Sequence, residues 1–269
     1  MSDPESEPLL FDLADGVARL TLNRPHEGNA MAPNMLAALE AAWVRVNEDA
    51  DVRVVLITGA GERHFCTGAS VSQLAVGKGS LNNVSHMRAN HFTPQQAHVT
   101  KPVICVVNGL CNGGGLHFVA EADVVIAHEG VQFMDTHVSV GQVSALESLG
   151  VARRAGPGAA LLMGLAGRAY RLPAARAYQL GLVDLLEADR DSAMARGMEL
   201  ATAMAGNSPQ AMALTKRAIW AGATMPDPQA LEFGWELLKS HWRHPDFSEG
   251  PAAFAEKRAP VWNPDPNAT

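Results

Sequence analysis

Two histidines and one glutamate are the side chains whose types and spacing best fit proton-transfer chemistry in this sequence. His117 lies two residues after three consecutive glycines, and His137 lies twenty residues further on. Glu147 follows in the next polar segment. Imidazole changes charge near neutral pH, so a histidine pair can divide the roles of acid and base. The pattern therefore favours a site that moves protons on a bound substrate.

The glycines that precede His117 end a segment that predicts a buried strand. Val103–Val107 is a short apolar run in which four of five residues are β-branched, as is typical of a strand covered on both faces. The glycines let the backbone approach a ligand, and 116–122 is predicted to be helical. The free N–H groups at such a helix start can stabilise an oxygen that becomes negative during a reaction.

A second backbone donor is predicted at Ala69. Ser70 is followed three residues later by Gln73, which is a capping-box pattern for a helix start. Ala69 would then lie just ahead of a helix with its N–H free. Two amides, at Ala69 and near the glycine triplet, are thus candidates for holding one oxyanion.

Composition excludes several classes of protein. The chain has 269 residues, 47% hydrophobic content and a formal net charge of −7, which fits an ordinary globular protein and argues against nucleic acid or an anionic membrane as a partner. No apolar run approaches the ~18 residues that a membrane span requires. The acidic N-terminus is unlike a signal peptide, and the three cysteines form no CxxC pair, so we expect a reduced, cytoplasmic setting.

Two cofactor-type sites are not expected. Gly59-Ala60-Gly61 follows a predicted strand, but His64 occupies the third glycine position of a dinucleotide fingerprint. The ten histidines include no HExxH and no recognised ligand spacing, so no metal site is expected.

Periodicity predicts a mixed α/β chain with a helical C-terminal part. The predicted strands are 9–13, 17–22, 52–58, 103–107 and 181–184, and the predicted helices are 34–48, 86–99, 116–122, 143–155, 158–165, 173–179, 192–205, 209–220, 228–242 and 247–257. We place a boundary near residue 190, with a core at 1–190 and a helical region at 191–269.

Several motifs occur together in one order and spacing. They are Asn23-Arg24-Pro25 with Asn29-Ala30, Phe65-Cys66-Thr67-Gly68-Ala69, Lys101-Pro102-Val103, Val107-Asn108-Gly109, the glycine triplet, Ala122-Asp123, and Phe254 with Lys257-Arg258. In this respect the chain resembles the crotonase, or enoyl-CoA hydratase/isomerase, superfamily over nearly its whole length. The resemblance implies a spiral of ββα units and a C-terminal helical region that forms a homotrimer or a dimer of trimers.

The resemblance also implies an acyl-CoA substrate, with no cofactor other than the coenzyme A that is part of it. The implied oxyanion hole consists of the backbone N–H groups of Ala69 and Gly114. The residues that the resemblance assigns to substrate or CoA binding are Arg24, Ala30, Cys66, Gly68, Gly113 and Lys257.

The sequence departs from the family where the chemistry would occur. Hydratases of the family carry glutamates at the positions of His117 and His137, and a Pro-Gly-Ala-Gly-Gly run near Glu147. We expect the dipole of the following helix to keep His117 neutral, as a base. Glu147 either partners a histidine or lies on a helix surface near arginines. Asp135 could orient His137, but a loop or capping role is the preferred interpretation.

These observations lead to one expected function and two alternatives. The expected function is an enoyl-CoA hydratase/isomerase type of enzyme, in which a histidine pair replaces the usual glutamate pair. One alternative is a hydrolase or lyase that cleaves a carbon–carbon bond of a β-dicarbonyl substrate, because a carbon–carbon-cleaving member of the family has a similar His/Asp pair. The other is a non-catalytic oligomer that binds acyl-CoA.

Overall fold

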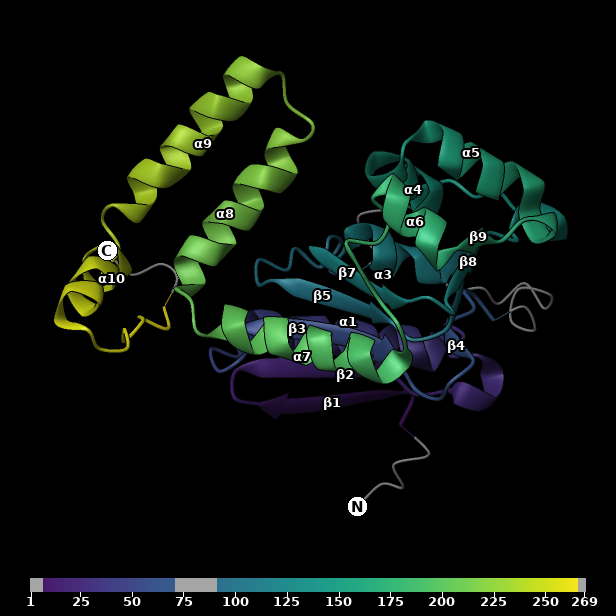
Figure 1. Cartoon of the computed structure of the whole chain (residues 1–269), viewed down its shortest axis with the longest axis horizontal. Helices are drawn as coiled ribbons and strands as arrows, with labels where there is room; N and C mark the ends of the chain where they lie inside the picture. Colours follow the sequence, from purple (N-terminus) through teal and green to yellow (C-terminus); the bar gives the residue numbers. More distant parts are fainter. Residues whose placement is uncertain (1–6, 71–90, 266–269) are drawn as a thin grey trace.

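The computed structural model describes residues 7–70 and 91–265, which form two sheets and a set of helices (Figure 1). The first sheet has the strand order β1-β2-β3-β5-β7-β10. Its β1 and β2 form an antiparallel hairpin, and the later strands pair in parallel. These strands are β1 (Leu9–Ala14), β2 (Val17–Leu22), β3 (Val54–Gly59), β5 (Val103–Val107), β7 (Val124–His128) and β10 (Leu185–Glu187).

The second sheet is smaller and has the order β4-β6-β8-β9. Its strands are β4 (His64–Cys66), β6 (Leu110–Asn112), β8 (Gln132–Met134) and β9 (Leu172–Pro173). Because β4, β6 and β8 directly follow β3, β5 and β7, each repeat places one strand in each sheet. This is the expected spiral of ββα units, and it brings the segments that follow β4, β6 and β8 side by side.

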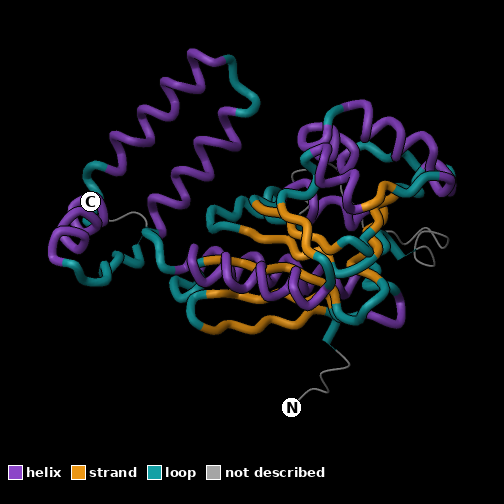
Figure 2. Tube along the Cα trace, in the orientation of Figure 1, coloured by secondary structure: helices purple, strands orange, loops and turns teal. Residues whose placement is uncertain are grey.

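Helices lie on both faces of the first sheet and form the C-terminal part (Figure 2). The α-helices are α1 (Pro33–Glu48), α3 (Leu116–Glu121), α4 (Leu146–Ala155), α5 (Pro157–Ala166), α6 (Ala174–Leu180), α7 (Arg190–Ala205), α8 (Pro209–Gly222), α9 (Asp227–His241) and α10 (Asp246–Glu256). The 3-10 turns are η2 (Pro25–Glu27), η5 (Gly113–Gly115), η6 (Val138–Val140) and η7 (Gly167–Ala169).

Two helix predictions need correction, and two predictions extend in part beyond the described residues. The helix predicted over 143–155 begins only at Leu146. Of the helix predicted over 86–99, residues 86–90 lie outside the described residues, whereas 91–99 form turns rather than a helix. The helix start predicted at Ser70–Gln73 also extends outside the described residues.

Apolar residues run without interruption in β3 and β5 because both faces of these strands are buried. In β3, Val54 and Leu56 pack in a cluster with α7, whereas Val55 and Ile57 point into the main core on the other face. Val103–Val107 alternates between the same two clusters, so the prediction of a strand covered on both faces is confirmed. Since α7 covers the sheet, the helical region that begins near residue 190 contributes to the core, and the boundary itself stays a prediction.

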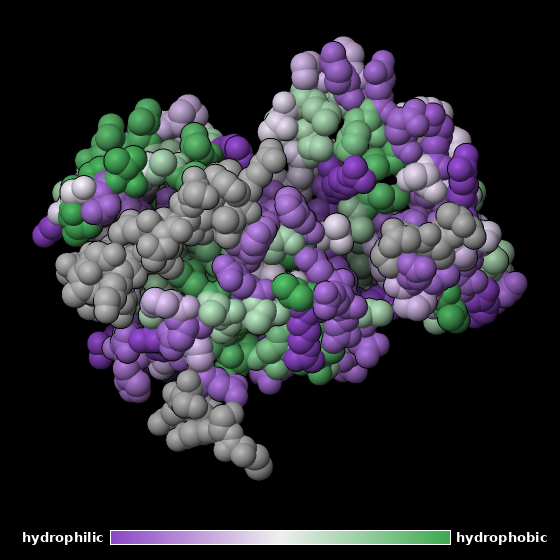
Figure 3. Space-filling view, turned by 180° about the vertical axis from the view of Figure 1, so that it is seen from behind, coloured by the Kyte–Doolittle hydropathy of each residue, from purple (hydrophilic) through white to green (hydrophobic). Residues whose placement is uncertain are grey.

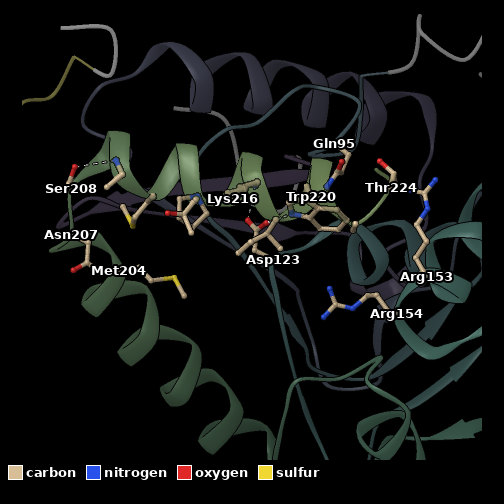
Figure 4. A pocket seen from close by; sticks show the side chains of 16 residues that line it. Gln95, Asp123, Arg153, Arg154, Met204, Asn207, Ser208, Lys216, Trp220 and Thr224 are labelled. Carbon is tan, nitrogen blue, oxygen red and sulfur yellow. Dashed lines mark hydrogen bonds and ion pairs between the residues drawn. The ribbon is translucent and has the colours of Figure 1, made fainter. Parts of the chain in front are cut away.

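The helices α8 and α9 form an antiparallel pair that extends away from the sheets (Figure 1). Asp123 ties α8, the first helix of this arm, to the spiral. Its carboxylate pairs with Lys216 at 2.7 Å, and it accepts hydrogen bonds from the Trp220 indole and the Val103 amide, each at 2.7 Å. Figure 4 shows this cluster on the wall of a cavity of about 990 Å³ beside α8. The Ala122-Asp123 motif is therefore structural.

We predict that Gly197→Val lowers the free energy of unfolding by about 2 kcal/mol, because it overpacks the interface between α7 and the sheet. A Cβ at this position would lie 2.6 Å from Val106 Cγ2 and 3.1 Å from Leu56 Cδ1. Gly158→Ala is the control, since a Cβ there meets no atom within 4 Å. Urea denaturation measures both variants, and equal stability of Gly197→Val and the wild type would contradict this packing.

Candidate active site

The segments after β4 and β6 meet at two glycines. Gly68 has φ +88°, and a Cβ on it would lie 2.9 Å from the backbone nitrogen of Gly114. A Cβ on Gly114 would in turn lie 3.7 Å from the backbone nitrogen of Ala69. A side chain at Gly68 would therefore collide with the other segment, and glycine permits both the contact and the left-handed backbone. The two amides that the resemblance assigns to an oxyanion hole come from segments in direct contact.

The loop before α1 fixes the direction of the Ala69 amide. Met31 donates its N–H to the Gly68 carbonyl at 2.8 Å and accepts from the Ser70 N–H at 3.4 Å. Met31 thus bonds to the residues on either side of Ala69, so the N–H of Ala69 itself points away from Met31. Among the loop and turn hydrogen bonds of the described residues, none uses the N–H of Ala69 or Gly114.

One carboxylate lies between the two histidines. Glu147 Oε1 is 3.3 Å from His117 Nε2 and 3.7 Å from His137 Nε2. Only 9% of Glu147 is exposed, and it belongs to the first turn of α4. Of the two interpretations of Glu147, the structure therefore favours the partner of a histidine over a residue of the helix surface.

The expectation of a neutral His117 is wrong. Burial alone lowers its pKa, but hydrogen bonds and charge interactions with Glu121 and Glu147 outweigh burial and raise the pKa to about 9. Glu121 Oε1 lies 3.2 Å from Nδ1, so each ring nitrogen faces a carboxylate. The dipole of α3 has the smaller effect on the pKa of His117, because this helix has only six residues. The full charges of Glu121 and Glu147, by contrast, lie within hydrogen-bonding range of the ring. The raised pKa favours a buried imidazolium over a neutral imidazole at His117 near pH 7.

Asp135 holds His137, so the preferred interpretation as a loop or capping residue was incomplete. Its Oδ1 accepts from the backbone N–H of His137 at 3.0 Å, which is a loop contact of the Asx-turn type, and also lies 2.7 Å from His137 Nδ1. This hydrogen bond is the main reason why the pKa of His137 is raised. With Nδ1 engaged, Nε2 faces Glu147. The ring also lies close to Gly113, whose Cβ would be 3.3 Å from His137 Cε1.

The carboxyl group of Glu147 remains charged in this arrangement. Burial raises its pKa, but the hydrogen bond and charge of His117, together with the charge of His137, hold the pKa below its ordinary value. The same balance applies to Asp135, where hydrogen bonds from His137 and Ser144 oppose burial and keep the pKa low. The site is therefore a row in which carboxylates and imidazoles alternate: Glu121, His117, Glu147, His137 and Asp135.

Three members of the site were not predicted from the sequence. Glu121 lies four residues after His117 on one helix, a spacing that places two side chains on the same face and could have revealed it. Ser144 and Ser148 also lie four residues apart, and both hydroxyl groups contact Asp135. No sequence signal links these serines to Asp135, because the contact joins α4 to the end of β8.

The remaining predicted binding residues are divided between the site and other regions. Ala30 is buried beside the loop that binds Gly68. Cys66 is fully buried, and burial raises the pKa of its thiol to about 12. Arg24 pairs with Glu27. Lys257 ends α10, on the arm that extends from the spiral, so a single chain does not place it at the site (Figure 1).

A cavity of about 740 Å³ adjoins His117 and Glu121. One stripe of α4 lines it with residues spaced at i, i+3, i+4 and i+7: Leu146, Leu149, Gly150 and Arg153. Within the described part of the chain, no group of three or more His, Cys, Asp or Glu side chains is placed to hold a metal ion. No described helix is both long and apolar enough to cross a membrane.

The ββα spiral places this chain in the crotonase class of enzymes. Residues 12–265 match the family model described as enoyl-CoA hydratase/isomerase, and the chain belongs to this family. It is 32% identical to (E)-benzylidenesuccinyl-CoA hydratase of Thauera aromatica, with 95% of this chain and 98% of that protein covered. It is 31% identical to carnitinyl-CoA dehydratase of Salmonella typhi, with 96% and 98% covered.

Solved structures show the same similarity. An enoyl-CoA hydratase/isomerase from Mycobacterium paratuberculosis matches with a TM-score of 0.86 and 35% identity, over 96% of this chain and 99% of that one. Enoyl-CoA hydratase from Bacillus anthracis matches with a TM-score of 0.83 and 27% identity, over 96% and 100%.

We predict that His117→Gln destabilises the protein by about 3 kcal/mol near pH 6, because it leaves the buried Glu147 and the partly buried Glu121 without their cation. The folded-state pKa of about 9 exceeds the ordinary value of 6.5, so this stabilisation is complete below pH 6.5 and is lost as the pH rises through about 9. Denaturation curves from pH 5.5 to 9.5 measure the effect. His26→Gln, at an exposed site, is the control. A stability difference that grows with pH would contradict a charged His117.

Proposed function

We propose that this protein is an acyl-CoA enzyme that stabilises a thioester enolate with the N–H groups of Ala69 and Gly114. The observation that carries the proposal is the contact between Gly68 and Gly114, which sets these two amides beside each other. A backbone or side-chain donor in a comparable oxyanion hole contributes about 3 kcal/mol to the transition state. The row of charges around Glu147 lies next to this point, because His137 contacts Gly113.

In the proposed hydration, Glu147 is the base and His137 is the acid. The Glu147 carboxylate takes a proton from water, the hydroxide oxygen bonds to the β-carbon, and the π electrons move onto the thioester oxygen. The enolate then collapses and takes a proton at the α-carbon from the His137 imidazolium. Transfer of the first proton from Glu147 to His137, across the 3.7 Å between Oε1 and Nε2, restores both groups. His117 remains charged and holds Glu147 in place.

Cleavage of a carbon–carbon bond is the second candidate function. The 2.7 Å contact between Asp135 and His137 favours it, because a carboxylate that charges or orients an imidazole also suits attack of water on a ketone. The enolate released by cleavage would occupy the same pair of amides. The products distinguish the two reactions: hydration gives a 3-hydroxyacyl-CoA, whereas cleavage of a β-dicarbonyl substrate gives a new carboxylate. Binding of acyl-CoA without turnover of any substrate would instead support a non-catalytic oligomer.

We predict that Glu147→Gln lowers kcat by about 100- to 1,000-fold, since the amide cannot accept the proton from water. Hydration of a panel of 2-enoyl-CoA thioesters, followed by the loss of enoyl absorbance and by product mass, measures the effect. Glu40→Gln is the matched control, because Glu40 is exposed on α1. Full activity of Glu147→Gln would remove Glu147 from the mechanism. Release of a new carboxylate from β-dicarbonyl thioesters, without hydration, would favour the second function.

The C-terminal arm supports a proposal about assembly. On α9, Leu231 is 76% exposed, Trp235 52% and Leu238 53%, so these apolar side chains are not core of this chain. A second apolar surface covers α5, where Leu161 and Leu165 are exposed (Figure 3). Large exposed apolar surfaces are typical of protein interfaces. These surfaces support the homotrimer, or dimer of trimers. The three cysteines, which are free and buried, support a cytoplasmic enzyme.

We predict that the wild type has about three or six times the chain mass of 28.5 kDa, and that Trp235→Glu with Leu238→Glu dissociates it. Light scattering after size exclusion measures the mass. Lys239→Glu is the control on the same helix, because it changes charge without removing apolar surface. A monomeric wild type would rule out the trimer.

A further inference from the structure

A polar cluster under the two candidate proton-transfer groups has no role in the hydration proposed above. It consists of Asp135, Ser144 and Ser148, and it joins the end of β8 to the first turn of α4. Asp135 has no exposed surface. A buried carboxylate is costly unless several donors surround it. The donors that surround Asp135 therefore identify what the cluster holds together.

Asp135 receives donors from two directions, one for each of its oxygens. Oδ1 accepts from the amide and from Nδ1 of His137, at 3.0 and 2.7 Å. Oδ2 accepts a short hydrogen bond from Ser144 and has a longer contact, 3.4 Å, with Ser148. One carboxylate thus bonds to the loop that carries His137 and to the segment that carries Glu147.

The two serines form a chain of hydroxyl groups. Their Oγ atoms are 2.7 Å apart. Each hydroxyl has one proton, and that of Ser144 is donated to Asp135, so Ser148 donates to Ser144. Ser148 follows Glu147 directly in α4, and Ser144 precedes the helix. The N-cap residue of α4, Ala145, offers no side-chain cap. The serine pair is therefore what ties the start of α4 to Asp135.

We propose that Asp135, Ser144 and Ser148 are positioning residues that fix the Nε2 edge of His137 against the carboxylate of Glu147. The inference rests on the proposed function, in which these two groups exchange a proton. Proton transfer requires donor and acceptor within hydrogen-bond reach, and a displacement of 1 Å can cost about 100-fold in rate. The 3.7 Å between His137 Nε2 and Glu147 Oε1 is already slightly longer than a hydrogen bond, so proton transfer tolerates no further separation of the two groups.

Three charged groups from three elements face His137. Asp135 precedes it in the same loop, Glu147 comes from α4, and His117 comes from α3. The two carboxylates raise the pKa of His137, and the charge of His117 lowers it. Removing the charge of Asp135 while retaining its shape should therefore lower the pKa of His137. If His137 acts as an acid, activity must then disappear at a lower pH than in the wild type.

The test uses the full-length protein with Ser144→Ala, Ser144→Thr and Asp135→Asn. We expect Ser144→Ala to lower kcat by about 10- to 100-fold with KM changed less than about threefold, because the groups remain but their separation is no longer fixed. Ser144→Thr, which retains the hydroxyl, should recover most of that loss. Asp135→Asn should move the alkaline limb of the kcat profile to lower pH. Ser139→Ala is the matched control, since this hydroxyl in the same loop accepts from the Arg168 amide.

A readout that needs no turnover separates the two proposals. NMR titration of His137 should give a lower pKa in Asp135→Asn and, to a smaller extent, in Ser144→Ala, both checked for folding by circular dichroism. If the two variants show these shifts but the wild type turns over no acyl-CoA, the positioning role of the cluster is supported and the proposed function is contradicted. An active enzyme whose kcat, pH profile and His137 titration are unchanged in Ser144→Ala would overturn the positioning role. If Asp135→Asn does not fold, the serine variants decide the question alone.

Discussion

The charge of Glu147, buried between two imidazole rings, is the constraint on which the rest of this site depends. A carboxylate that is 9% exposed is stable only if cations and donors replace the water it has lost. His117 and His137 supply that replacement, and each has a carboxylate of its own on its other nitrogen. Loss of one member would leave a neighbour buried with an unpaired charge. The five groups therefore have to be regarded as one unit.

The fold brings this unit together from two successive turns of the spiral. Strand β6 leads into the glycines and α3, which carries His117, and β8 leads into the loop that carries Asp135 and His137. The helix α4 then returns over α3 and brings Glu147 between them. The glycines are needed where these segments meet, because Cβ atoms at positions 68 and 114 would collide with the neighbouring backbone or with Met31. The same contact places the two candidate oxyanion amides beside each other.

Much of the fold could be predicted from the sequence, because local patterns determine it. The apolar run at 103–107 requires cover on both faces, and the spacing of the motifs is typical of the family. The charge state of His117 was predicted wrongly. Its place at a helix start is visible in the sequence, but the carboxylate that reaches it from α4 is not. Asp135 was underestimated for the same reason, since Ser144 and Ser148 approach it from another element.

The family has glutamates where this chain has histidines, and the structure indicates how the departure is compensated. A carboxylate from α4, Glu147, lies between the two histidines that occupy these positions. A carboxylate at each ring nitrogen of His117, Glu147 and Glu121, suits the counter-ion role that we propose for it. The site still contains ionisable groups, although different positions of the chain now supply the carboxylate and the imidazoles.

The most direct test of this account is ¹⁵N NMR of the wild-type protein with labelled histidine side chains. The account predicts that both ring nitrogens of His117 carry protons at every pH from 5 to 8, and that the ring loses a proton only near pH 9. It also predicts that His137 titrates above the ordinary pKa of histidine, 6.5. A His117 ring with one unprotonated nitrogen at pH 7 would contradict the central claim, because Glu147 would then lack the cation that keeps it charged.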